Sequence, residues 1–289
     1  MSADDGDEAP MDEPGNDEGG LGEIGGGDEE TDMDEALRRP FVKAEREFVQ
    51  LQEAGDHDGA VRCLETVLRQ EQEAVQQMRD TVLSSLFECL AVGYNTLGMK
   101  FLKDGNTVES CKFFEKAEAL TDPANLHMTR EARRVLRAVT YNNMGCFYKS
   151  MGKLHTALQY LKRAQAIEEQ LQGHCQNPAG THLNLCALLS QMGKHKEALR
   201  HAERARQLLE VGEAPVSGSD ESLICVAYFN MGAEYEHLRQ SREALWSYER
   251  ALEHSKHDLG EDHPLSLQIS GCVEQLNVKI TARKKAPGR

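Results

Sequence analysis

The sequence lacks the features that mark a membrane protein, a disulfide-stabilised domain or a zinc-binding domain. Its apolar runs stay well short of the roughly 18 residues that a membrane-spanning helix needs, and its acidic start lacks the charged-then-apolar layout of a signal peptide. The eight cysteines are scattered without a C-x-x-C pair, so we expect reduced thiols in a helical core. These absences predict a soluble, cytoplasmic protein.

Sequence patterns for catalysis and for cofactor or metal binding are also missing. Neither G-x-S-x-G nor H-E-x-x-H occurs, and the one G-x-G-x-x-G match, from Gly20 to Gly25, is flanked by glycine and acidic residues. A phosphate-binding loop needs a strand before it and a helix after it, because these elements aim its backbone N–H groups at the phosphate. We therefore predict no catalytic residue, no cofactor and no metal site, and hence no enzyme.

Basic residues are absent from residues 1–36, which contain fifteen Asp or Glu. Since the whole chain has 48 acidic and 33 basic residues, the rest carries both signs equally, and the net charge of −15 belongs to this segment. With so few apolar side chains to offset the entropy of ordering, residues 1–36 are predicted to be a disordered acidic tail. Its charge disfavours nucleic acid and membrane as partners. A short basic tail, also predicted to be disordered, covers residues 282–289.

Between the tails, residues 37–281 show apolar residues at spacings of three and four, which is typical of helices, and the pattern repeats. Each copy has a large residue, a small one four positions later, a turn position that holds glycine in all but the last copy, and a late alanine. The small residue lets the first helix of a pair approach the second closely, and the alanine admits the next pair. In four copies the small residues are Gly98, Gly145, Cys186 and Gly232. The last copy has Arg239 at the turn, and Trp246 is expected to pack in its second helix.

These four copies resemble the tetratricopeptide repeat family. The small residues lie 47, 41 and 46 positions apart, and such long units are similar to those of kinesin light chain and Pins-type domains. The resemblance implies an all-α fold, a right-handed α-solenoid of about five antiparallel helix pairs. A terminal helix opened by Pro264, at about 265–281, is expected to cover the last pair.

Asparagines recur two positions before the small residue, at 143, 184 and 230. In a tetratricopeptide solenoid the first helices line the concave groove, so these amides are expected to face it. An amide offers two donors and an acceptor oxygen, and a row of them suits the backbone of an extended peptide. The alternative is that they bond only to neighbouring groups of the protein. The residues expected to bind peptide are Asn95, Asn142, Asn143, Asn184, Asn230, Met99, Lys103, Lys149, Leu183 and Phe229.

The predicted function is that of an adaptor, a monomer or part of a hetero-complex, whose groove binds an extended segment of a partner protein. One alternative is a structural spacer subunit of a motor, ciliary or scaffold assembly, associated with cilia or the cytoskeleton. Another is a co-chaperone that grips a C-terminal carboxylate. The chaperone-binding members of the family use several basic side chains for that purpose, and this groove offers only Lys103 and Lys149.

Overall fold

The computed structural model describes residues 27–77, 81–171, 178–211 and 220–285, and every regular element in these ranges is an α-helix. The helices are α1 (Gly27–Glu53), α2 (His57–Gln70), α3 (Gln72–Gln77), α4 (Thr81–Lys103), α5 (Thr107–Leu120), α6 (Arg130–Ser150), α7 (Leu154–Gln170), α8 (Pro178–Gln191), α9 (His195–Val211), α10 (Asp220–His237), α11 (Ser241–Asp258) and α12 (Pro264–Lys285).

The chain divides into two units, residues 1–39 and 40–289. The predicted acidic tail lies mainly outside the described residues, and its final part, 27–36, differs from the prediction because it is helical. Helix formation is cooperative, so a helix held further along by the buried Phe41 extends backwards through polar residues at little cost. Similarly, α12 continues to Lys285 into the predicted basic tail, of which residues 286–289 lie outside the described range.

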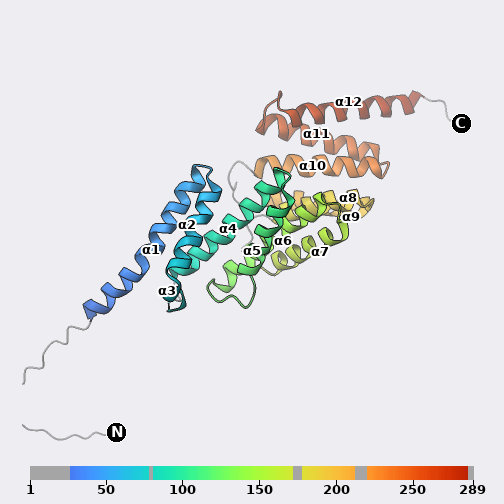
Figure 1. The fold of residues 1–289 in the computed structure, drawn as a ribbon. Coiled ribbons are helices and arrows are strands. Elements are labelled where there is room, and N and C mark those ends of the chain that lie inside the picture. Colours follow the sequence, from blue (N-terminus) through green and yellow to red (C-terminus); the bar gives the residue numbers. More distant parts are fainter. Residues whose placement is uncertain (1–26, 78–80, 172–177, 212–219, 286–289) are drawn as a thin grey trace, which may run out of the picture. The chain divides into compact units, whose positions relative to one another are not determined.

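From α4 to α11, consecutive helices pack as pairs in chain order (Figure 1). The second helix of each pair packs on its first, and α12 packs on α11. The first helices α4, α6, α8 and α10 also contact one another in sequence and form a continuous row. The prediction of an all-α solenoid of helix pairs is confirmed, and its terminal helix begins at Pro264 as expected.

The small residues allow close contact within each pair. A Cβ atom at Gly98 would lie 2.5 Å from the ring of Phe114, and one at Gly145 would lie 2.5 Å from Leu161 Cγ. Real Cβ atoms do not approach so closely, so the bulky residue of the second helix occupies the space that the glycine leaves. In the α8–α9 pair the same two positions hold Cys186 and Ala202, both buried. In this pair the larger of the two side chains, Cys186, therefore lies on the first helix instead of the second.

A glycine with positive φ ends the first helix of most pairs. The φ angles of Gly105, Gly152 and Gly193 lie between 72° and 78°. In the last pair Arg239 takes this place with a φ of 62°, in the left-handed region that costs a side chain roughly 1 kcal/mol or more. The turn geometry is therefore set by the stacked fold and not by glycine alone.

Trp246 differs from its predicted role as a packed residue. Its ring lies edge-on against Tyr228, with centroids 5.8 Å apart, but the residue remains 50% exposed. The repeat pattern fixes which face of the second helix packs on the first, and Ala244 lies on that face. Trp246 follows Ala244 by two positions and so points away from the centre of the face. It therefore lies at the margin of the contact.

His182 occupies the position that holds a tyrosine in the three neighbouring copies. Its Nδ1 lies 2.9 Å from Nδ1 of His201 on α9, and it is almost fully buried. Burial, with smaller contributions from His201 and Arg204, lowers the pKa of His182 to about 4. Burial, assisted by Lys162 and opposed by Glu197 and Glu169, also lowers the pKa of His201.

Acid is therefore expected to destabilise the α8–α9 pair. In the unfolded chain a histidine binds a proton near pH 6.5, whereas folded His182 does so only near pH 4, so the unfolded state holds more protons between these values. Stability should be full above about pH 6.5 and fall as the pH decreases towards 4. His182→Gln, which cannot titrate, should lose less stability between pH 7 and pH 5 in urea unfolding. Equal losses in both proteins would contradict this account.

Candidate functional site

An amide cluster joins the first helices α4 and α6. Asn143 Nδ2 donates to Asn95 Oδ1 at 3.0 Å, and Asn95 Nδ2 donates to Thr140 Oγ1 at 3.0 Å. Asn95 also donates to the carbonyl oxygen of Ala91 and is only 5% exposed. One buried amide thus connects two repeats and satisfies its own polar atoms.

The same arrangement recurs between α6 and α8. Asn184 Nδ2 donates to Asn142 Oδ1 at 3.0 Å, and the Thr181 hydroxyl lies 3.4 Å from that same oxygen. Thr181 also donates to Glu168 Oε1 at 2.8 Å. Burial raises the pKa of Glu168, against the opposing effect of the Thr181 hydrogen bond. In both clusters an asparagine donates to an asparagine of the preceding repeat.

The interface between α8 and α10 breaks this rule. The positions equivalent to Asn142 and Thr181 hold Leu183 and Ala227, which pack with Ala179 and Ala205 in an apolar cluster. Asn230, at the position of Asn143 and Asn184, therefore has no acceptor on the preceding helix. Within the described residues its side chain makes no hydrogen bond, and it is partly exposed.

These contacts explain why helix interiors contain asparagine, a mediocre helix former. Asn143 and Asn184 each use one N–H to bind the preceding repeat, which compensates for their low helix propensity. Each keeps a second N–H and an acceptor oxygen, and both residues are partly exposed. Asn230 keeps all of its hydrogen-bonding groups. Among these asparagines, Asn95 and Asn142 accept the hydrogen bonds that join neighbouring repeats. Asn143, Asn184 and Asn230 keep polar groups that no contact within the described residues uses.

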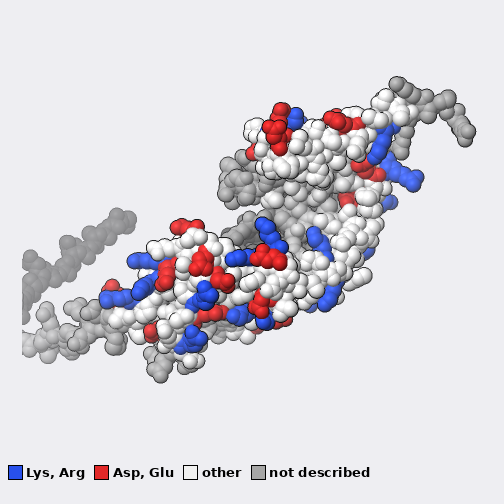
Figure 2. Space-filling model, turned by 45° about the horizontal axis from the view of Figure 1, so that its top comes forward, with Lys and Arg blue, Asp and Glu red and all other residues white. Residues whose placement is uncertain are grey.

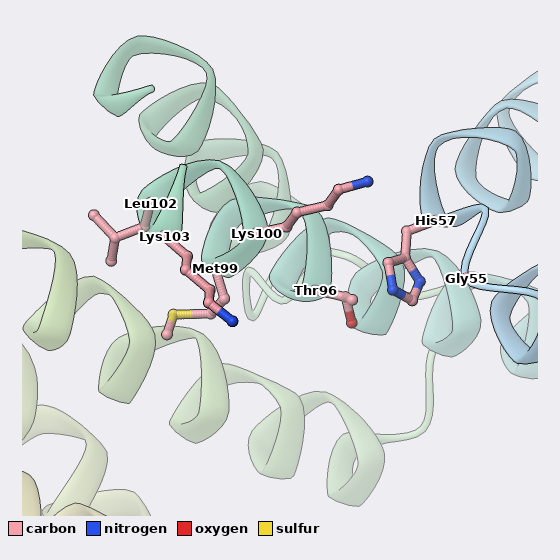
Figure 3. Close-up of a pocket in the computed structure, with 7 residues that line it drawn as sticks. All are labelled: Gly55, His57, Thr96, Met99, Lys100, Leu102 and Lys103. Atoms are coloured by element: carbon pink, nitrogen blue, oxygen red, sulfur yellow. The ribbon is translucent and has the colours of Figure 1, made fainter. Parts of the chain in front are cut away.

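A pocket of about 660 Å³ opens beside α4 (Figure 3). The turn after α1 and the start of α2 contribute Gly55 and His57, and α4 contributes Thr96, Met99, Lys100, Leu102 and Lys103. Thr96, Met99 and Lys103 project to one side of α4, as their spacing of three and four requires, and His57 faces Thr96. Met99 and Lys103, both predicted to bind peptide, thus line an observed cavity.

The other predicted residues fall into two groups. Lys149 and Phe229 are partly exposed on α6 and α10, as the groove prediction requires. Leu183 is 7% exposed and lies in the core between α8, α9 and α10, so it presents no surface to a ligand. Leu183 lies three positions before the small residue of its helix, as Asn95 and Asn142 do in theirs. This position faces the first helix of the next repeat.

Charges of both signs are interspersed over the described residues of the face in Figure 2, without a patch of one sign. At the α10 end, the acidic groups are compensated. Glu234, almost fully buried, lies 2.8 Å from Nδ1 of His195, whose ring stacks on His237. Glu236 accepts from the hydroxyl of Tyr248 and from Lys279. Burial, with the nearby Glu236, raises the pKa of Tyr248 above its usual range.

Sequence reasoning missed the threonines that complete the clusters. Thr140 and Thr181 both lie five positions before the small residue of their helix, and Ala227 takes that place in α10. This recurrence was present in the sequence, but its meaning depends on which helix faces the hydroxyl. The contact of Glu234 with His195 gave no repeat signal.

The described residues contain neither a metal-binding cluster nor a membrane-spanning helix. In that part of the chain, no group of three or more His, Cys, Asp or Glu side chains could hold a metal ion. None of its helices is both long enough and apolar enough to cross a membrane.

Comparison with known proteins adds a family to this geometry. Residues 136–210, which contain both Asn142 and Asn184, match the family model for the tetratricopeptide repeat. They span most of α6 to α9, including the amide cluster between α6 and α8. No curated protein sequence matches the chain.

Two solved structures share the helical fold over more of the chain. BtubC (BKLC) from P. vanneervenii is 19% identical, with a TM-score of 0.54 over 79% of this chain and 94% of that one. A Rap protein complexed with Competence and Sporulation Factor is 14% identical, with a TM-score of 0.52 over 86% and 74%. At these identities the likeness establishes the fold alone.

The solved structures similar to this chain include a kinesin light chain, the subfamily that the repeat length indicated. A Podosopora anserina protein with TPR-like repeats of the kinesin light chain kind is 14% identical over 76% of this chain and 97% of that one. Its TM-score of 0.47 is too low to add to the fold argument. A tetratricopeptide fold supports a role in protein–protein interaction in general.

Proposed function

We propose that the exposed row formed by α4, α6, α8 and α10 binds an extended segment of a partner protein, so that the protein acts as an adaptor and not as an enzyme. The observation that carries the proposal is the set of amides at one repeat position whose groups are not all used internally. Asn230 uses none within the described residues, and Asn143 and Asn184 each keep an acceptor oxygen. Such groups can pair with the N–H and C=O groups of an extended backbone.

The surroundings of these amides fit such a ligand. Met99 and Phe229 are at least partly exposed on α4 and α10, and can contact apolar side chains of the segment. Lys103 and Lys149 supply positive charge beside them. Asn95 and Asn142 accept hydrogen bonds from Asn143 and Asn184 and so hold these two side chains in place.

Binding of the full chain to a displayed library of natural protein segments tests the proposal. Asn230→Ala should weaken captured segments about three- to tenfold, the loss of one net hydrogen bond, without loss of helix content, because Asn230 has no internal partner to lose. Asn277→Ala, an exposed asparagine on α12, is the matched control and should leave affinity unchanged. No capture by the wild type, or equal affinity of the Asn230 variant, would overturn the proposal.

A structural subunit is the second candidate, and the outer face of α12 favours it. Leu267 is 59% exposed and Val278 is 70% exposed on this last helix, and Gly271 between them has no atom within 4 Å of a Cβ position. An end of a solenoid that remains alone in water usually carries polar residues. This face would suit permanent contact in a larger assembly, and the library experiment would then capture nothing in the row.

A further inference from the structure

The outer face of the last helix, α12, exposes apolar side chains. Figure 1 shows α12 as the outermost helix at this end of the chain, where it packs on α11. Its inward face contributes Ile269 and Leu276, both buried. On the opposite face, Leu267 is 59% exposed and Val278 is 70% exposed. Exposed apolar residues that share a helix face mark interaction sites more often than single ones do.

The residues of this outer face follow a pattern that is symmetric about its middle. Leu267, Gly271 and Val278 are spaced by four and seven positions, so they lie on one stripe of the helix. Leu267 and Val278 lie equally far from the midpoint between residues 272 and 273. Near that midpoint, a Cβ at Gly271 would have no atom of the described residues within 4 Å, so another helix can approach closely there. A two-fold contact needs such a self-complementary surface, because the same patch is used by both copies.

Charge at the two ends of α12 sets the direction of such a contact. The turn before the helix contains the exposed residues Glu261 and Asp262, and the helix sequence ends in a basic run at 283–285. Glu261 pairs with Lys256 of its own chain, but its side chain remains 77% exposed. If two copies of α12 run antiparallel, the acidic start of one lies beside the basic end of the other, whereas a parallel contact brings like charges together. Charge and apolar pattern therefore favour the same antiparallel arrangement.

We infer that a second copy of this chain covers the outer face of α12, with the two helices antiparallel and related by a two-fold axis. Leu267 of each copy lies against Val278 of the other, and the exposed Glu274 has room beside Gly271 of the other. The inference goes beyond the proposed function, because the contact uses no residue of α4, α6, α8 or α10. Since each copy contributes one helix of about 33 Å, the interface is small for a stable complex, and the dimer is expected to dissociate at micromolar concentrations.

Sedimentation velocity of the full chain at about 1–100 μM tests the inference. The wild type should form dimers as its concentration rises. Leu267→Glu and Val278→Lys should each weaken association about tenfold or more, because each places a charge in the apolar contact. Combined in one chain, they should recover at least part of that loss, because the new carboxylate then meets the new ammonium group of the second copy. Within one copy the two positions lie about 16 Å apart along the helix, so the recovery cannot arise inside one chain.

Leu126→Glu is the matched control, because Leu126 is 65% exposed in the connection between α5 and α6. This variant should dimerise as the wild type does, and circular dichroism should show the same helix content in every variant. A wild type that stays monomeric over the whole range, equal weakening by Leu126→Glu, or a double variant that associates no better than the single ones would overturn the inference. Capture of segments by the row is measured separately, so its failure would overturn the proposed function and leave the dimer standing.

Discussion

Replacing Phe114 with alanine is expected to lower the stability of the protein by about 3–5 kcal/mol, the usual cost of removing a buried aromatic ring. Phe114 is fully buried, and its ring supplies the three atoms nearest to a Cβ built at Gly98. Its ring also meets that of Phe147 on α6, with centroids 5.9 Å apart, so the loss affects two helix pairs. Urea unfolding followed by helix content measures the change.

A compensating change tests the reason for this loss. Gly98→Leu alone should also destabilise, because a Cβ there collides with Phe114. Combined with Phe114→Ala it should recover part of the loss, since the pair then resembles Cys186 and Ala202 in the α8–α9 pair. Phe113→Ala, which removes a ring that is only partly buried, is the control and should cost less. A double variant no more stable than Phe114→Ala would contradict the account of this contact.

Replacing Leu183 with asparagine is expected to destabilise the protein by about 2–4 kcal/mol. The change removes a buried apolar side chain and places an amide beside Ala227, which has no hydroxyl with which to pair. Adding Ala227→Thr rebuilds the combination found between α4 and α6 and between α6 and α8. This double variant should regain about 1 kcal/mol or more, because Asn230 and the new threonine then supply partners.

The same pair of variants separates the two roles of the asparagines. In the double variant Asn230 acquires an acceptor on α8, as Asn143 has on α4, and should bind captured segments more weakly. The midpoint of urea unfolding, together with affinity for a captured segment, checks both effects. If the added threonine restores no stability, the polar clusters do not contribute as proposed.

Much of the fold could be predicted from the repeat. The small residues, the turn glycines and Pro264 each act through local geometry, so their spacing alone placed the helix pairs and the last helix. Arg239 shows the limit of this reasoning, because its left-handed conformation is imposed by the surrounding helices and not by its own preference.

The candidate site was less predictable, because it depends on contacts between repeats. The sequence placed asparagines on the first helices, but the direction in which Asn143 reaches back to Asn95 depends on how α4 and α6 stack. Leu183 was expected in the groove for the same reason, and the stacking instead turns it into the core. The pocket also needs the turn after α1, whose repeat signal is weak.

Hydrogen exchange of the full chain, with and without a captured segment, tests the central claim most directly. The account predicts slower exchange in α4, α6, α8 and α10 on binding, with little change in α5, α7, α9 and α11, because a segment in the row covers only the first helices. Protection confined to the second helices or to α12 would contradict it, and would favour the structural-subunit function in its place.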